Sequence, residues 1–147
     1  MGNWQPQLPQ WACFDTAFHS TLPPEASTYA LPQAWRPQGL RRFGFHGLSH
    51  QHVSETVSRL YADRRRTAAQ PLRLISCHLG AGCSLCAIRA GRSLATTMGY
   101  TPMEGLVMAT RSGSVDPGLL LHLLEQGLSP ALLERGLQTE SGLLGLS

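Results

Sequence analysis

The segment Leu72–Thr97, LRLISCHLGAGCSLCAIRAGRSLATT, alternates short apolar runs with glycine-containing turns. Its first run, residues 72–78, is mostly apolar and ends in glycines, which indicates a buried strand. The runs 84–89 and 92–97 flank Ala90-Gly91, the spacing of a two-residue hairpin. The segment therefore predicts three consecutive strands joined by tight turns.

Helical patterns lie on both sides of these strands. Upstream, a helix is predicted to start near Ser49, because Val53, Val57, Leu60 and Tyr61 fall on one helical face. Before it, the proline-rich residues 20–40 are expected to form an irregular connection.

Three start signals for helices follow the strands. Thr101-Pro-Met-Glu104 has the pattern of a capping box with proline at the first helical position, which predicts a short helix there. Asp116-Pro117 and Ser129-Pro130 each predict a further helix start, and Gly127 is expected to end the first of these two helices. The order of helix, three antiparallel-prone strands and helices predicts an α/β fold.

Length and composition favour a soluble globular domain. The chain has 147 residues, of which 42% are hydrophobic and 14% charged. No run approaches the roughly 20 apolar residues that span a bilayer, and the start MGNWQPQLPQW is unlike a signal peptide. We therefore expect no membrane partner and a cytoplasmic location.

All positive side chains other than histidine are arginines, because the sequence contains no lysine. Any phosphate clamp in this chain must therefore use arginine, histidine or main-chain amides. The densest basic run, Arg64–Arg66, has no interleaved aromatic residues and is interpreted as a solvated helix end. No nucleic-acid partner is expected.

The stretch CHLGAGCSLC, Cys77–Cys86, has two interpretations. Cys83 and Cys86 have the C-x-x-C spacing of a zinc ligand pair, and Cys77 and His78 lie just upstream. On an extended strand, however, positions three apart point to opposite faces. We therefore expect no metal here and three buried cysteines acting as small apolar side chains, with a small zinc protein as the alternative.

The second interpretation is a phosphate loop. Gly80 and Gly82, in a turn between strands, let main-chain N–H groups approach an anion without an intervening side chain, and His78 can add a donor. Glycine-rich turns are common, so this pattern needs support from other motifs.

Six motifs supply that support, and together they resemble the acetate kinases of the acetokinase family. They are FDTAFH (14–19), YALP (29–32), RRFGFHGLSH (41–50), CHLGAG (77–82), TTMGYTPMEGLVMATRSG (96–113) and ESGLLG (140–145). They occur in the order found in the family and extend over almost the whole chain from about residue 9. The shared order is more specific than any single motif.

The resemblance implies roles for particular residues. Asp15 is similar to an active-site acid-base or positioning carboxylate, while His46 and Arg111 are similar to the pair that stabilises the transition state. The nucleotide phosphates are expected to contact the loop made of His78, Leu79, Gly80, Ala81 and Gly82. Ala81 stands where family members commonly have asparagine, so a side-chain amide is absent from this loop.

The resemblance also implies an architecture of two actin/hexokinase-like (ribonuclease H-like) lobes. Residues 1–19 are expected to end a truncated first lobe, and residues 20–147 to begin a truncated second lobe, with 20–40 as a linker. The implied reaction transfers a phosphoryl group between ATP and acetate. The ligands of ATP and Mg²⁺ are expected largely outside this chain, and the intact family member is expected to be a homodimer.

Two alternatives to an acetate kinase fragment remain open within the resemblance. One is a propionate- or butyrate-type kinase, since the acyl pocket lies mostly outside these residues. The other is a non-catalytic remnant that binds phosphate or a partner at most. Because several expected substrate ligands are absent, we expect little catalysis by the 147 residues alone.

Overall fold

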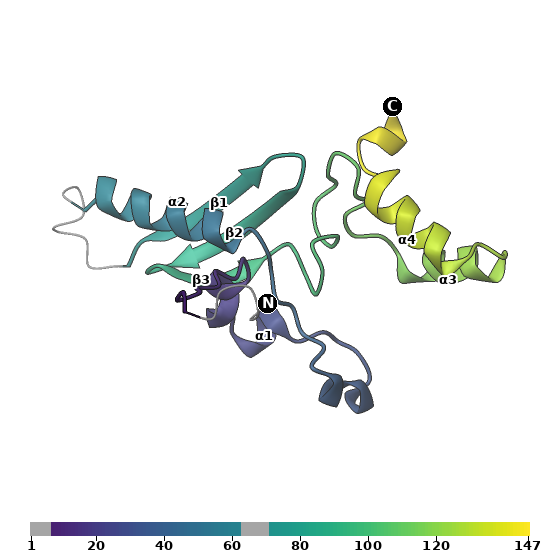
Figure 1. Cartoon of the computed structure of the whole chain (residues 1–147), viewed down its shortest axis with the longest axis horizontal. Helices are drawn as coiled ribbons and strands as arrows, with labels where there is room; N and C mark the ends of the chain where they lie inside the picture. Colours follow the sequence, from purple (N-terminus) through teal and green to yellow (C-terminus); the bar gives the residue numbers. More distant parts are fainter. Residues whose placement is uncertain (1–6, 63–70) are drawn as a thin grey trace.

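The computed structural model describes residues 7–62 and 71–147. In chain order its elements are η1 (Ala17–Thr21), α1 (Pro24–Ser27), η2 (Gln33–Gln38), α2 (Gly47–Leu60), β1 (Arg73–Leu79), β2 (Cys83–Arg89), β3 (Arg92–Thr96), α3 (Pro117–Glu125), α4 (Pro130–Thr139) and η4 (Leu144–Leu146). The predicted order of helix, three strands and helices is confirmed. Figure 1 shows α2 and the sheet at one end of the molecule and α3 and α4 at the other.

The three strands form one antiparallel sheet in the order β1-β2-β3, as the sequence predicts. The register pairs Cys77 with Leu85 and Leu79 with Cys83. In the turn between β2 and β3, Ala90 and Gly91 have φ values of 51° and 75°. Positive φ at both central residues is the requirement of a type I′ hairpin turn, which matches the twist of the strands.

The main helix, α2, begins at Gly47 rather than near Ser49. The cause is Asp15: its Oδ2 accepts a hydrogen bond from the main-chain N–H of His46 at 2.6 Å, and its Oδ1 one from Leu48 at 3.4 Å. The carbonyl oxygen of Asp15 accepts from Gly47 at 2.8 Å. These bonds satisfy amides that have no partner within the first turn of a helix.

Helix α2 lies across one face of the sheet (Figure 1). Most buried side chains near this interface are polar; they are His19, His50, Ser54, Ser76, Ser84 and Ser93. The buried apolar side chains are Leu22, Cys86, Ile88, Met98 and Met108. Buried polar groups need hydrogen-bond partners, so this interface depends on a specific hydrogen-bond network as well as on apolar packing.

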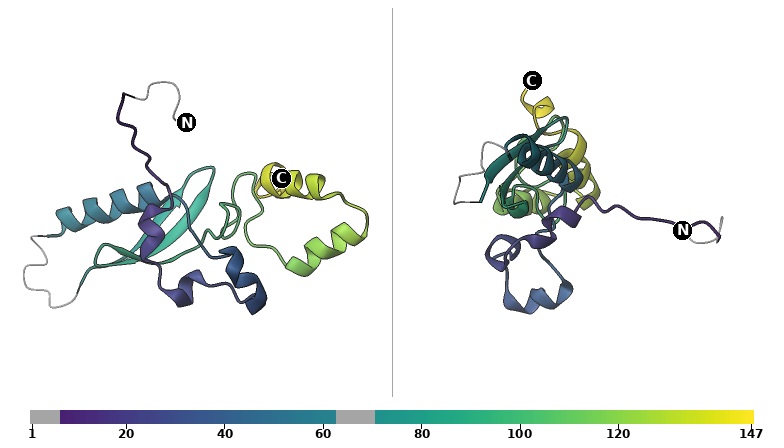
Figure 2. Two further views of the ribbon diagram at one scale, coloured as in Figure 1. Left: turned by 60° about the horizontal axis from the view of Figure 1, so that its bottom comes forward. Right: turned by 90° about the vertical axis from the view of Figure 1, so that its left-hand side faces the viewer.

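The other face of the sheet is apolar, and residues 7–62 and 71–147 leave much of it exposed. Ile75 and Leu79 of β1 are 76% and 73% exposed. The whole chain exposes 10640 Å², whereas a compact monomer of 16.0 kDa exposes about 7,400 Å². The excess agrees with the extended outline in Figure 2, in which η2 and the pair α3 and α4 project from the sheet.

The helices after the sheet correct one prediction and confirm two. No helix forms at Thr101–Glu104. The Glu104 carboxylate instead pairs with Arg42 at 2.5 Å and accepts a hydrogen bond from Tyr29, so it is not available to close a capping box. Gly105, with φ 110°, also takes the backbone out of the helical region.

The helices α3 and α4 start at the two predicted signals. The Asp116 side chain accepts from the Gly118 amide at 2.8 Å, and the Ser129 hydroxyl accepts from Leu132 at 3.3 Å. Gly127 follows α3 with φ 93°. Residues 20–40 contain the short turns α1 and η2 between irregular segments. The division into lobes at residue 20 stays a prediction.

Among residues 7–62 and 71–147, no helix combines the length and the apolar character that crossing a membrane requires. The interpretation of Arg64–Arg66 as a solvated helix end falls outside the described residues.

Candidate active site

His46 occupies the turn into α2 in an unusual conformation. Its φ of 57° places it in the left-handed region, which a non-glycine residue adopts at an energetic cost. The bond from its amide to Asp15 holds this conformation. The next residue, Gly47, has no room for a side chain, since a Cβ there would lie 2.1 Å from the carbonyl oxygen of Asp15. Asp15 therefore positions His46 through the main chain.

The imidazole of His46 lies against the strand that leads into the glycine loop. It stacks on the ring of His78, with centroids 3.9 Å apart and planes 20° apart. Its Nδ1 is 2.9 Å from the hydroxyl of Ser84 on β2. His78 is held in turn by Ser49 of α2, whose hydroxyl is 3.0 Å from Nδ1 of His78. Both histidines thus have one ring nitrogen fixed by a serine.

The glycine loop meets His46 and Arg111 at Gly82. A Cβ on Gly82 would lie 3.3 Å from both Cε1 and Nε2 of His46, and 3.5 Å from Nη1 of Arg111. Gly82 is therefore needed for this close approach rather than for a positive φ. The loop, the imidazole and the guanidinium therefore converge at Gly82.

Arg111 is held by the segment that precedes it in the chain. Its Nη1 donates to the carbonyl oxygen of Pro102 at 3.2 Å. The carbonyl of Ala81 accepts from the amide of Ala109 at 3.0 Å, which joins the loop to the segment before Arg111. The part of the molecule around residues 102–111 thus holds both the loop and the guanidinium.

The electrostatic environment favours neutral imidazoles. Burial lowers the pKa of His46, and the nearby His78, Arg111 and His19 act in the same direction, while Asp15 opposes them. Burial is also the main cause that lowers the pKa of His50, to about 4. A neutral imidazole has one N–H donor and one acceptor nitrogen, so hydrogen-bond partners decide which atom faces a ligand.

The cysteines do not form a zinc site. Among the residues that the structure describes, no group of three or more His, Cys, Asp or Glu side chains is arranged to hold a metal ion. Cys86 is buried while Cys83 is half-buried, in line with opposite faces of β2, and all of the cysteines are free. The expectation of three buried cysteines holds for Cys86 alone: Cys83 is half-buried, and Cys77 is exposed because it lies on the outer face of β1 with Ile75 and Leu79.

The same part of the chain does not fit a complete magnesium site. Mg²⁺ is held by oxygen ligands, often carboxylates and substrate phosphates. The Asp15 carboxylate accepts hydrogen bonds from main-chain amides, and no cluster of acidic side chains joins it among the described residues.

The motifs do not indicate Ser84, whose hydroxyl is hydrogen-bonded to His46, or Ser76, whose hydroxyl is hydrogen-bonded to His50. Strand alternation was the available signal, because it places Ser76, His78 and Ser84 on one face of the sheet. The structure places His50 fully buried between these two serines.

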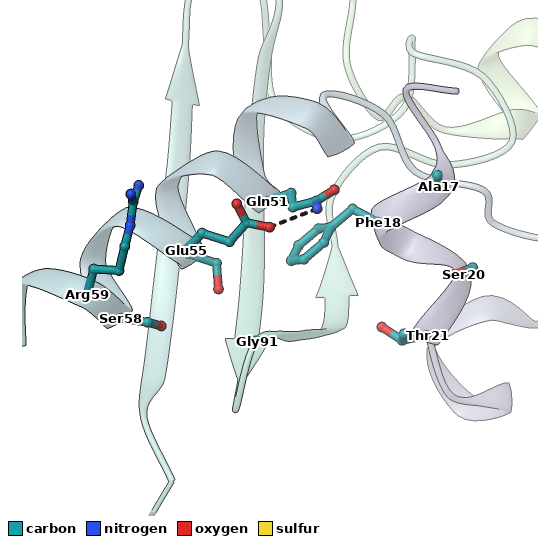
Figure 3. Close-up of a pocket in the computed structure, with 10 residues that line it drawn as sticks. Ala17, Phe18, Ser20, Thr21, Gln51, Glu55, Ser58, Arg59 and Gly91 are labelled. Atoms are coloured by element: carbon teal, nitrogen blue, oxygen red, sulfur yellow. Dashed lines mark hydrogen bonds between the residues drawn. The ribbon is translucent and has the colours of Figure 1, made fainter. Parts of the chain in front are cut away.

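A separate groove lies on the flank of α2 (Figure 3). It has a volume of about 730 Å³ and is lined by η1, by α2 and by Gly91 of the hairpin turn. Along its α2 wall, Gln51 donates to Glu55 at 2.9 Å. The groove contains none of the predicted site residues, so its size alone does not make it the active site.

Relatives of known family match nearly the whole chain. The model of the acetokinase family matches residues 2–147. An acetate kinase from Synechococcus sp. strain JA-2-3B'a(2-13) is 57% identical over 142 residues, which are 97% of this chain and 34% of that protein. The acetate kinase of Thermosynechococcus vestitus is 53% identical over 147 residues, again 34% of its length.

Solved structures agree with the sequence comparison. The acetate kinase of Porphyromonas gingivalis is 43% identical with a TM-score of 0.82, over 91% of this chain and 33% of that one. A propionate kinase from Francisella tularensis is 42% identical with a TM-score of 0.86, over 95% and 35%. This likeness supports the expected actin/hexokinase-like class. Although it spans about a third of these relatives, the chain belongs to the acetokinase family, a family of phosphotransferases.

Proposed function

We propose that this chain is part of an acetate kinase, which transfers the γ-phosphoryl group of ATP to acetate. In this proposal the chain supplies groups that stabilise the transition state and groups that contact the nucleotide. The observation that supports this most directly is the convergence of His46 and Arg111 on Gly82, where an added Cβ would lie 3.3 Å from the imidazole and 3.5 Å from the guanidinium. These three positions come from separate motifs, and each has the role that phosphoryl transfer requires. In this proposal Asp15 is a positioning residue, because its carboxylate bonds the amide of His46.

The chemistry needs little beyond positioning and charge stabilisation. A carboxylate oxygen of acetate attacks phosphorus, the bond from phosphorus to the β,γ-bridging oxygen breaks, and ADP and acetyl phosphate form. Negative charge spreads over the equatorial oxygens in the transition state. The guanidinium of Arg111 and an N–H of His46 can donate to these oxygens, while amides of the loop 78–82 contact the nucleotide phosphates. The acceptor is already an anion, so no general base is required.

ATP with Mg²⁺ is the cofactor pair of this proposal, and Mg²⁺ would neutralise phosphate charge when bound. The ligands of the metal and most of the acetate pocket are assigned to sequence beyond these residues. A homodimer of the complete enzyme and a cytoplasmic location belong to the same proposal.

A chimera tests the proposal directly. Residues 1–147 would replace the matching stretch of the Thermosynechococcus vestitus enzyme, which aligns with all 147 residues. Acetyl phosphate formed from ATP, Mg²⁺ and acetate would be trapped with hydroxylamine. We expect activity in the chimera, and a loss of about 100-fold or more in kcat for Arg111→Ala or His46→Ala.

Arg135→Ala is the matched control, because Arg135 is an exposed arginine paired with Glu140 at 2.6 Å. It should retain the activity of the parent chimera. A folded chimera without phosphoryl transfer would refute the proposal and support the non-catalytic alternative. The 147-residue chain, assayed alongside, is expected to show little or no turnover.

The chain is similar to a propionate kinase as well as to acetate kinases, and this likeness gives propionate as the second candidate acceptor. Acetate and propionate should therefore be compared in the same chimera. If kcat/KM is higher for propionate than for acetate, propionate becomes the proposed substrate, and the roles of His46 and Arg111 are unchanged.

A further inference from the structure

The interface between α2 and the sheet contains a chain of alternating serines and histidines. The hydroxyl of Ser84 on β2 is 2.9 Å from Nδ1 of His46 and 2.8 Å from Nε2 of His50. On the far side of His50, Nδ1 is 2.9 Å from the hydroxyl of Ser76 on β1. The connected order is therefore Ser76, His50, Ser84, His46, and it ends beside the glycine loop.

The shared hydroxyl of Ser84 is fully buried, as is the ring of His50. A serine hydroxyl has one hydrogen to donate and lone pairs that accept. It can therefore donate to only one of its two imidazole partners, and the other partner must donate to it. Any other arrangement leaves a buried hydrogen or nitrogen without a partner, which lowers its population about tenfold or more.

This restriction links the proton positions of the two rings. When Ser84 donates to Nδ1 of His46, the proton of neutral His46 is on Nε2, and His50 must hold its proton on Nε2 to donate to Ser84. When Ser84 donates to Nε2 of His50, both rings hold their protons on Nδ1. Ser76 satisfies Nδ1 of His50 in either case, because its hydroxyl can donate or accept.

We propose that His50 is a positioning residue for His46: through the hydroxyl of Ser84, the two neutral imidazoles carry their protons on the same ring nitrogen. His46 then presents Nε2–H toward the space beside Gly82 only in molecules in which His50 also holds its proton on Nε2. The pairing is a property of these residues alone, whereas its use in catalysis rests on the proposed function.

The consequence for phosphoryl transfer follows from geometry. Nε2 of His46 is the ring nitrogen near Gly82 and Arg111, since Nδ1 is engaged by Ser84. A hydrogen on Nε2 can donate to a phosphoryl oxygen, whereas a bare lone pair would repel it. Although His50 does not contact the loop, it would thus set the fraction of molecules ready to stabilise the transition state.

Nuclear magnetic resonance of the 147-residue chain tests the pairing without any activity assay. With histidine labelled by ¹⁵N, long-range proton–nitrogen correlations give the tautomer populations of each neutral ring. Single His→Gln variants assign the signals. We expect equal Nε2–H populations for His46 and His50 in the parent chain, and unequal populations in Ser84→Ala.

Ser49→Ala is the matched control, because Ser49 holds His78 in the same way but has no hydrogen bond to His46 or His50 in the described network. It should leave the two populations equal. Opposite tautomers in the parent chain would overturn the proposal, and so would populations that stay equal in Ser84→Ala. If Ser84→Ala does not fold, the parent spectrum and the variant Ser84→Cys, whose thiol is a weaker partner, still decide.

The catalytic consequence is measured separately in the chimera. There Ser84→Ala should lower kcat about tenfold with little change in KM, because a smaller fraction of His46 presents a donor. Matched tautomers in an inactive chimera would uphold the pairing and refute the proposed function. Unmatched tautomers in an active chimera would refute the pairing and uphold the proposed function.

Discussion

Acid should destabilise this fold through His50. Burial, followed by the charges of His19, His46 and His78, lowers the pKa of this imidazole from 6.5 to about 4, and Asp15 opposes the shift. In the unfolded chain the ring takes up a proton near pH 6.5, whereas in the folded chain it stays neutral until about pH 4. The unfolded state binds more protons in this window, so stability is present above pH 6.5 and is lost as the pH falls toward 4.

The size of the effect follows from the two pKa values. The unfolded value of 6.5 and the folded value of about 4 differ by about 2.5, and a pKa difference of 1 corresponds to about 1.4 kcal/mol. His50 alone should therefore remove about 3 kcal/mol of the free energy of unfolding, a large part of the roughly 5–15 kcal/mol of an ordinary domain. The pKa values of His19 and His46 are lowered as well, so their contributions have the same sign.

Urea denaturation followed by far-ultraviolet circular dichroism would measure this loss between pH 7 and pH 4. The parent chain should lose stability steeply with acid, and His50→Gln should show a clearly smaller slope. His52→Gln, which removes an exposed imidazole from the same helix, should keep the slope of the parent. A proton resonance titration that places the pKa of His50 near 6.5 would refute the reasoning even if the variant does not fold.

Three other parts of the molecule give independent tests. Gly82→Ala should weaken MgATP binding by the chimera about tenfold in calorimetry, because the added Cβ would lie 3.3 Å from His46. Gly80→Ala is the control and should weaken binding less, since its Cβ would have its nearest contact at 3.4 Å and none with His46. Replacing both Ile75 and Leu79 by serine should reduce self-association of the chain in sedimentation velocity; unchanged association would show that the outer sheet face is not responsible. Asp15→Ala should lower the midpoint of thermal unfolding by about 5 °C through loss of the α2 cap, with partial recovery in Asp15→Asn; an unchanged midpoint would contradict the capping role.

Part of the candidate site was predictable from motifs, and part was not. Likeness to the family indicated Asp15, His46, Arg111 and the loop 78–82, and the structure brings these positions together. Ser84 was overlooked because it has no motif of its own. Its importance depends on lying between two imidazoles of α2, which becomes evident only when that helix is packed on the sheet.

The failed helix at Thr101–Glu104 illustrates the same limit. The local pattern is a valid start signal, but Glu104 binds Arg42 and Tyr29, which are more than 60 residues away in sequence. A charge-assisted pair in a half-buried position outweighs the small gain of a capping box. Local propensity is a weak term whenever a distant partner competes for the same side chain.

The amino-acid sequence by itself determined the three strands, the two-residue turn at Ala90-Gly91 and the starts of α3 and α4. These features depend on alternation, on positive φ and on capping, all of which act between near neighbours in the chain. Only the tertiary structure decided that Asp15 holds His46, that Gly82 meets Arg111 and that one serine serves two histidines. The physical reason is that each of these contacts joins segments far apart in sequence, whose distance is set by packing.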